Sequence, residues 1–195
     1  MSSGAGEAIG SIDTAIGRLA VRRAMLNDVD VATVLSIMVD AAQLPLTRGI
    51  DMWGWVRTPS GERVVRERIA NDEVYLAEMA GRAIATVCVQ WSDPETWGDR
   101  GRDDTAGYVH GLAVSRGHQG RGVGKALVDW AAARIAARGR RRLRLDCMGE
   151  NSQLCKYYQE DLSLRPVGTT RGKGWSAQLF EKDLNFDAQG GQRPS

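Results

Sequence analysis

The chain has 195 residues, of which 43% are hydrophobic and 26% are charged, a balance typical of one globular domain. Its formal net charge is only +2, which provides no electrostatic argument for nucleic acid as a partner. Three cysteines without CxxC spacing and only two histidines argue against a disulfide framework, a zinc site and a His-rich metal site, so we predict no metal.

The sequence shows no signal for a membrane or for secretion. We find no run of about 18 apolar residues that would span a bilayer. The N-terminal residues are rich in Ser, Gly and Ala and lack the basic segment followed by an apolar stretch that marks a secretory signal. We therefore predict a cytoplasmic protein that does not engage a membrane.

Residue patterns divide the chain into one domain between two weakly patterned ends. Residues 1–17 are small and without clear periodicity, so we predict a flexible N-terminal arm. Residues 185–195 have the same character and are predicted to form a flexible C-terminal tail. The single domain is expected to cover residues 18–184.

Within that domain, apolar periodicity and turn residues predict strands that alternate with helices. A strand over residues 18–24 precedes a helix that starts at the N-cap Asn27 and ends before Pro45. Ser60 is expected to cap a short second helix, and residues 92–107 are expected to form a polar loop. The remaining elements follow in order: a β-hairpin over residues 73–91, a strand over 108–114, a helix over 122–138, a strand over 142–148, a helix over 151–161, and two closing strands over 165–170 and 175–184.

The order of these elements predicts a mixed α/β sheet with helices on both faces. The strands over residues 108–114 and 142–148 flank a helix, and a crossover of this kind makes the two strands parallel neighbours. The hairpins on either side make the rest of the sheet antiparallel.

The segment HQGRGVGKAL, residues 118–127, joins the strand over residues 108–114 to the next helix. Its alternating glycines let a ligand approach the main chain closely, and the helix start offers unpaired N–H groups and a partial positive charge. Together they predict an anion site suited to a phosphate or pyrophosphate. Ala126 follows Lys125, so the Ser or Thr of a P-loop is missing, and the dinucleotide-binding pattern GxGxxG is also incomplete.

Residues 119–124 (QGRGVG) match the pattern Q/R-x-x-G-x-G/A, and residues 151–158 (NSQLCKYY) match N-x-x-L-x-x-x-Y. With a strand before the first pattern and a helix after it, the chain resembles the GNAT (Gcn5-related N-acetyltransferase) superfamily over roughly residues 18–184. The resemblance implies the GNAT fold, a mostly antiparallel sheet whose central parallel strand pair is splayed at the coenzyme A (CoA) site. Leu162 and Ser163 depart from the Gly-Phe of many relatives, and this weakens the choice of Tyr158 over its neighbour, Tyr157, as the functional tyrosine.

The resemblance implies that the protein is an acetyl-CoA-dependent N-acetyltransferase. The acetyl group would pass by direct attack to the amine of a small-molecule acceptor, with acetyl-CoA as cosubstrate and no metal. Two alternatives stay open, a non-catalytic acyl-CoA-binding or regulatory module and a protein N-acetyltransferase. Dimers are common in this superfamily, and a homodimer is also left open.

Binding roles also follow from the resemblance. Backbone N–H groups after the strand hold the pyrophosphate, the strand edge pairs with the pantetheine arm and polarises the thioester carbonyl, and an asparagine hydrogen-bonds the pantetheine. The expected cofactor-binding residues are Leu112, Ala113, Val114, Gln119, Gly120, Arg121, Gly122, Val123, Gly124, Lys125 and Asn151.

Two catalytic side chains are expected. Tyr158 is the candidate general acid that protonates the departing thiolate. His110 is the candidate base, and strand alternation predicts that it shares a face with Leu112. Packing roles for both His110 and Tyr158 remain alternatives. Other groups that could accept the amine proton are Glu78, Asp146, Glu150 or a chain of waters.

Tryptophans gather in the two regions that wall the acceptor site in this superfamily. Trp53, Trp91 and Trp97 are expected to bind the substrate, because aromatic faces beside acidic side chains suit a cationic amine with an apolar body. The alternative is that these tryptophans are core residues and that the acidic residues form a solvated loop.

Overall fold

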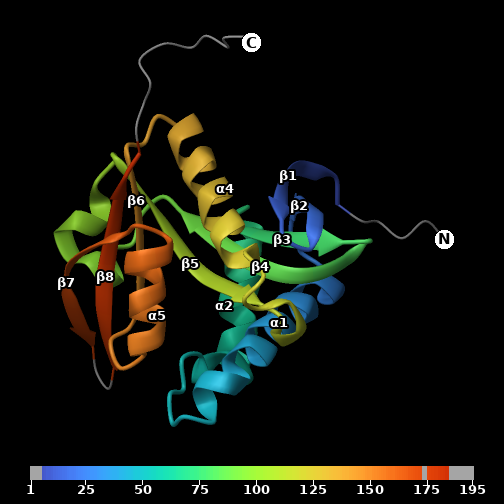
Figure 1. The fold of residues 1–195 in the computed structure, drawn as a ribbon, viewed down its shortest axis with the longest axis horizontal. Coiled ribbons are helices and arrows are strands. Elements are labelled where there is room, and N and C mark those ends of the chain that lie inside the picture. The colour runs from blue at the N-terminus through green and yellow to red at the C-terminus, as the bar shows by residue number, and fades with distance from the viewer. Residues whose placement is uncertain (1–5, 173–174, 185–195) are drawn as a thin grey trace.

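The computed structural model describes residues 6–172 and 175–184, which form one eight-stranded sheet with helices on both faces (Figure 1). The strand order is β1-β2-β3-β4-β5-β6-β8-β7, and every neighbouring pair is antiparallel except β5 and β6. The mixed sheet predicted from the sequence is confirmed. The strands are β1 Ala8–Thr14, β2 Gly17–Arg23, β3 Val74–Met79, β4 Arg82–Gln90, β5 Ala106–Val114, β6 Arg142–Met148, β7 Arg165–Gly172 and β8 Trp175–Asp183.

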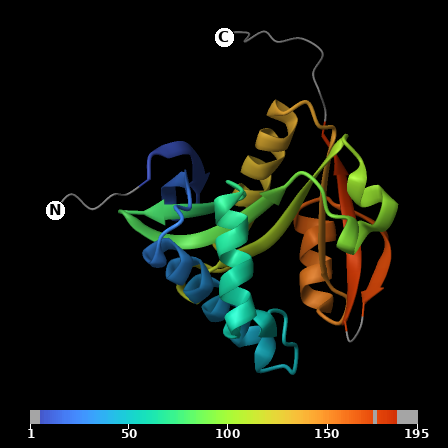
Figure 2. The same cartoon turned by 180° about the vertical axis from the view of Figure 1, so that it is seen from behind.

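Two helices cover each face of the sheet, and each face has its own buried apolar core. Val34 and Ile69 belong to the core on the face that Figure 2 shows in front, and Leu127 and Ile135 belong to the other. Helices α1 (Asp28–Leu46) and α2 (Pro59–Ala70) pack on the first face, and α4 (Val123–Ala137) and α5 (Ser152–Lys156) on the second. The predicted loop over residues 92–107 contains a short helix, α3 (Pro94–Trp97), and a 3₁₀ turn over Gly98–Arg102.

The N-terminal segment differs from its sequence prediction. Residues Ala8–Thr14 form β1, which pairs antiparallel with β2, so a strand replaces the predicted flexible arm over this stretch. Ile12 is the one buried residue of β1, which explains why no apolar alternation marks the strand in the sequence. The predicted C-terminal tail, residues 185–195, lies outside the described residues.

Two helix boundaries differ from their predicted positions, and a proline lies at each. α1 continues through Pro45 to Leu46, because a proline in the last turn removes a single backbone bond close to the helix end. Thr58 rather than Ser60 caps α2, because Pro59 occupies the first helical position, where a missing N–H has no cost.

The sequence analysis found no apolar run long enough to span a membrane, but α1 is such a segment. By length and composition alone, residues 28–47 could cross a membrane. In the structure, however, this helix packs on α2, β4 and β5. Its buried apolar residues are Val31, Val34, Ile37, Met38 and Ala42. The apolar face of α1 therefore has a partner within the domain.

A β-bulge interrupts the middle of β5. Cys88 of β4 pairs with His110, and Thr86 pairs with Ala113, so two steps along β4 correspond to three along β5. Gly111 lies at the bulge with a φ of +54°, a left-handed conformation that glycine adopts without a steric penalty.

The bulge corrects one prediction about the candidate base. The extra residue breaks the alternation of side chains along β5, and Leu112 packs against the core under α4. His110 instead pairs with Cys88, which belongs to the core under α1 and α2. The prediction that His110 and Leu112 share a face is therefore wrong.

The parallel strand pair separates at the same place. Pairing of β5 with β6 runs from Ala106↔Arg142 to Val109↔Leu145 and goes no further among the described residues. Beyond it, β5 stays with β4 and β6 stays with β8, so the two strands diverge (Figure 1). The predicted splay is confirmed, and β5 presents backbone groups without a strand partner on the side facing β6.

A buried ion-pair network joins β2 and β3 to the start of α1. Arg22 donates two hydrogen bonds to Asp30, at 2.6 and 2.9 Å, and one to Glu78 at 2.7 Å. The Arg22 and Asp30 side chains are 8% and 4% exposed. Burial alone would raise the pKa of Asp30, but hydrogen bonds from Arg22 and from the amide of Met25 lower it below its ordinary value.

We expect Arg22→Met to destabilise the protein by about 3–5 kcal/mol, because it leaves the buried carboxylate of Asp30 and the partly buried one of Glu78 without a cationic partner. The pH dependence should also change sign. In the wild type, the lowered pKa of Asp30 means that its ionised form stabilises the fold above about pH 4, and this stability is lost as the pH falls further. In the variant, burial raises the pKa of Asp30 instead, so stability falls as the pH rises. Urea unfolding between about pH 2 and pH 7 measures both effects. Arg63→Met, which removes an exposed pair, is the control, and equal stability of Arg22→Met and the wild type would contradict this assignment.

Candidate active site

Two grooves open along the separated strands and meet at one point. The first groove, of about 700 Å³, runs from the end of α1 past Leu112–Val114 of β5 to the N-terminus of α4 and the side of α5. The second groove, of about 470 Å³, lies between the segment before α2, the bulge of β5 and the ends of β6 and β8. Molecules bound in the two grooves would touch where the linings are shared, at Met52, Trp53, Leu112, Leu154 and Tyr158.

The N-terminus of α4 faces the first groove without a side-chain cap. Its N-cap, Gly122, has a φ of +79°, and no capping side chain accepts hydrogen bonds from the first amides of the helix. Gly120 also has a positive φ, of +70°, and neither glycine has another residue within 4 Å of the place where a Cβ would stand. Open N–H groups with the helix dipole behind them form a seat for an anion.

Two hydrogen bonds hold the loop between β5 and α4. The side-chain amide of Gln119 donates to the carbonyl of Val114 at 2.9 Å. The amide of Arg116 donates to Asp40 of α1 at 2.8 Å. The glycine-rich turn is thereby tied both to the strand before it and to the helix across the first groove.

Most predicted cofactor-binding residues line the first groove, and two do not. Val123 is 1% exposed, and its side chain belongs to the core under α4. Arg121 is exposed and lines neither groove. The side chain of Val123 is therefore not available for the predicted role, which leaves its backbone. The residues in the lining are Leu112, Ala113, Val114, Gln119, Gly120, Gly122, Gly124, Lys125 and Asn151.

Asn151 lines the first groove and joins two of its segments. Its side-chain oxygen accepts a hydrogen bond from the amide of Leu154 at 3.1 Å and caps α5, and its nitrogen donates to Sδ of Met52 at 3.2 Å. The side chain therefore fixes both the start of α5 and the segment before α2. Its predicted contact with pantetheine stays a prediction.

Tyr158 lies where the grooves meet, whereas Tyr157 lines the first groove only. Tyr158 is 5% exposed and packs edge-on against Phe180, with ring centroids 5.6 Å apart. Burial is the main cause that raises the pKa of Tyr158 well above its ordinary value, so the phenol keeps its proton. A π-helical turn over Tyr157–Asp161, a distortion common at functional sites, presents this side chain.

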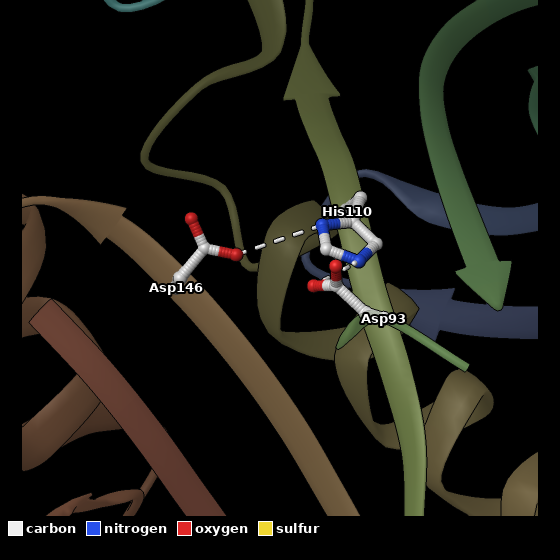
Figure 3. Close-up of side chains that lie close together, drawn as sticks. All are labelled: Asp93, His110 and Asp146. Carbon is white, nitrogen blue, oxygen red and sulfur yellow. Dashed lines mark ion pairs between the residues drawn. The ribbon is translucent and has the colours of Figure 1, made fainter. Parts of the chain in front are cut away.

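His110 lies in the second groove between two carboxylates (Figure 3). Its Nε2 is 3.4 Å from Oδ2 of Asp93, and its Nδ1 is 3.5 Å from Oδ1 of Asp146 on β6. Asp93 caps α3, because its other oxygen accepts from the amide of Thr96 at 3.1 Å. Among the described residues, neither His110 Nε2 nor Asp93 Oδ2 has an aligned hydrogen-bond partner, so these buried atoms have only each other for compensation.

The two carboxylates differ in how readily they take up a proton. Burial raises the pKa of Asp93, but His110 and Thr96 outweigh this effect, and the pKa lies below its ordinary value. Burial raises the pKa of Asp146 above its ordinary value, and the charge of Asp93 adds to this increase against the opposing charge of His110. Asp93 is therefore ionised near neutral pH, and Asp146 is the more easily protonated of the two.

The same three side chains have the spacing of a metal-binding cluster, with potential ligand atoms within 4.8 Å of one another. The two close contacts, however, use opposite nitrogens of the imidazole ring. Ligands of one metal ion would converge on a single point, whereas here the carboxylates lie on opposite sides of the ring. This arrangement is better suited to an imidazole that takes up and releases protons.

Two of the three other candidate bases lie outside the grooves. Glu78 pairs with the buried Arg22 at 2.7 Å, and Glu150 is exposed and accepts a hydrogen bond from Ser176 at 2.8 Å. Neither residue lines either groove, whereas Asp146 does. The geometry therefore leaves His110, with its two carboxylates, as the candidate base of the second groove.

Of the three predicted substrate-binding tryptophans, only Trp53 lines the grooves. Trp97 is 4% exposed and belongs to a small core beside β5 and β8. Trp91 packs under the guanidinium of Arg138, 4.3 Å from its ring centre. For Trp91 and Trp97 the substrate-binding prediction does not fit, and the packing alternative does. The second groove is walled instead by Trp53 with Trp55 and Trp175.

Comparison with known proteins agrees with this geometry. The model of the acetyltransferase (GNAT) family matches residues 42–163. A Bacillus subtilis (strain 168) protein named the uncharacterized N-acetyltransferase YesJ is 27% identical over 163 residues, which cover 81% of this chain and 87% of that relative.

Two solved structures show the same fold. A GNAT-family acetyltransferase from Listeria monocytogenes is 24% identical with a TM-score of 0.72, and the match covers 90% of this chain and 100% of that one. The protein yncA from Salmonella typhimurium, solved with its cofactor acetyl-CoA, is 15% identical with a TM-score of 0.60 over 88% of this chain and 96% of that one. Because the family model matches more than half of the residues, the chain belongs to the acetyltransferase (GNAT) family.

Proposed function

We propose that this protein is an acetyl-CoA-dependent N-acetyltransferase that acetylates the amine of a small molecule. The observation that carries the proposal is the junction of the two grooves at Leu112 and Tyr158, with an anion seat along one groove and His110 in the other. Family membership supports acetyl-CoA as the donor, and the yncA structure holds acetyl-CoA on a similar fold.

The donor occupies the first groove in this proposal. Amides at the start of α4 bind the pyrophosphate, where the helix dipole favours negative charge. The backbone of Leu112–Val114, which has no strand partner on the β6 side, pairs with the pantetheine arm. An N–H group at this edge also stabilises the oxyanion that forms when the thioester carbonyl is attacked.

The reaction takes place at the junction. The acceptor amine, as free base, attacks the thioester carbon, so that a C–N bond forms and the C–S bond breaks. The amine proton passes to His110, and the phenol of Tyr158 donates a hydrogen bond to the departing thiolate, which then takes up a proton from water. Burial makes this phenol a weak acid, so Tyr158 contributes mainly as a hydrogen-bond donor to the developing thiolate and its effect is moderate.

Asp93 acts as a positioning residue for His110. Its ionised carboxylate faces Nε2 and favours the tautomer with a proton on that nitrogen. Nδ1 is then left unprotonated on the side of Asp146, which lines the second groove. A proton taken from the acceptor can be shared between Nδ1 and Asp146, whose raised pKa suits it to receive one.

Release of free thiol from acetyl-CoA tests the proposal. We expect turnover with at least one class in a panel of aryl amines, polyamines, amino sugars and amino acids. Tyr158→Phe should be slower by about 10- to 100-fold, and Tyr157→Phe should lose less because it lines only the donor groove. Tight CoA binding without turnover of any amine, together with no effect of Tyr158→Phe, would favour a non-catalytic acyl-CoA-binding module. Turnover of peptides alone would make the protein a protein N-acetyltransferase.

A further inference from the structure

Arg68 is a cation of the second groove that has no acidic partner in the described part of the chain. It lies in the last turn of α2 and lines the groove. Across residues 6–172 and 175–184, no side-chain hydrogen bond and no ion pair within 4.0 Å reaches its guanidinium. The other arginines of α2 differ, because Arg63 pairs with Glu67 at 2.8 Å and Arg66 pairs with Asp28 at 2.6 Å.

Two carboxyl groups lie near enough to respond to the charge of Arg68. Burial raises the pKa of both Glu73 and Asp146, and Arg68 is among the charges that oppose this rise in each. Glu73 already accepts a hydrogen bond from Gln90 at 2.7 Å. Arg68 therefore lies close to the reacting end of the second groove, but its five N–H donors have no direct carboxylate partner among the described residues.

The second groove thus carries opposite charges on different elements. Arg68 projects from α2. His110 and Asp146 lie on β5 and β6 and receive the proton of the amine in the proposed reaction. Tryptophan side chains line the same groove and suit an apolar body. A molecule with an ammonium group and an anionic group would match both charges of such a groove.

Resting on the proposed function, we propose that Arg68 binds an oxyanion of the acceptor, which is therefore an amino acid or a related amine that carries a carboxylate or phosphonate. The planar guanidinium matches either oxyanion with two parallel hydrogen bonds. Such a contact engages a part of the acceptor other than the reacting amine, and it holds the nitrogen at the junction beside His110 and Tyr158.

Matched pairs of acceptors test this inference. Each pair consists of an α-, β- or γ-amino acid and the amine that lacks its carboxylate, with aminoalkylphosphonates as a third arm that distinguishes the two oxyanions. We expect wild-type kcat/KM to favour the anionic member of at least one pair by about 10- to 100-fold. Arg68→Met should remove this preference by raising KM for the anionic acceptor, with the bare amine unchanged. Arg68→Lys should retain part of it, since lysine keeps the charge but not the planar fork.

Arg63→Met provides the control on the same helix and should keep the wild-type preference. An equal loss with both members of a pair, or a wild type without preference for anionic amines, would overturn the inference while leaving the acetyltransferase function intact. Should no amine be turned over, the proposed function fails. Calorimetric titration of the carboxylated amines into the CoA complex would then still test the subsite, because weaker binding to Arg68→Met than to Arg63→Met is expected, and equal binding would refute it.

Discussion

Replacing His110 with glutamine should lower kcat/KM for amine acetylation by about 100- to 10,000-fold at neutral pH, the range that general base catalysis contributes. Glutamine keeps polar atoms near Asp93 and Asp146 but cannot take up the amine proton. The deficit should shrink as the pH approaches the pKa of the acceptor amine, near 10 for an alkylamine, because more of the acceptor is then already free base. Steady-state kinetics between about pH 6 and pH 10 measures this profile.

Three measurements separate catalysis by His110 from a role in folding. CoA affinity should be unchanged in His110→Gln, because this residue does not line the first groove. Asp93→Asn should cause a smaller loss, since asparagine still caps α3 but no longer stabilises a charged imidazole. Asp104→Asn, an exposed change in the segment after α3, should have no effect. A rate for His110→Gln within a few-fold of the wild type at all pH values would assign proton removal to Asp146 or to water instead.

Replacing Gly124 with leucine should weaken CoA binding by at least about 100-fold. A Cβ at this position would stand 3.2 Å from the hydroxyl of Tyr157, which leaves the rest of the side chain to fill the first groove. The pyrophosphate would be kept from the amides at the start of α4, and each charge-assisted hydrogen bond lost there is worth about 1.5–3 kcal/mol. Leucine favours a helix more than glycine does, so α4 itself should not be weakened.

Isothermal titration calorimetry with CoA measures this loss, and the chain offers a matched control. Gly117 lies in the same loop, is exposed and lines neither groove, and a Cβ added to it would meet nothing within 4 Å. Gly117→Leu should therefore bind CoA as the wild type does. Wild-type affinity in Gly124→Leu would place the pyrophosphate away from α4 and remove the basis of the proposed donor groove.

The donor half of the candidate site could be predicted from the sequence because it is local in the chain. The strand, the glycine-rich turn and the start of α4 follow one another within residues 108–125, and their backbone supplies the proposed contacts. Patterns of glycines and apolar residues report backbone conformation directly. Even here, the burial of Val123 and the exposure of Arg121 depend on how α4 packs on the sheet.

The acceptor half could be predicted only in part. Asp93 lies before α3, His110 on β5 and Asp146 on β6, and these segments meet through strand pairing and the packing of the α3 segment. Whether a tryptophan is a core residue or a groove residue depends on its neighbours in space, so Trp91 and Trp97 were expected in the wrong place. A bulge is defined by two strands together, and the extra residue at Gly111 becomes visible only beside β4.

The amino-acid sequence alone reveals the mixed sheet, the central strand–helix–strand unit and the resemblance to the GNAT superfamily, since these depend on residues close together in the chain. Packing adds the first strand, the side on which His110 lies, its two carboxylates, and Arg68 without an acidic partner among the described residues. Those features arise from contacts between segments far apart along the chain, and a pattern within one segment carries no information about which distant segment will face it.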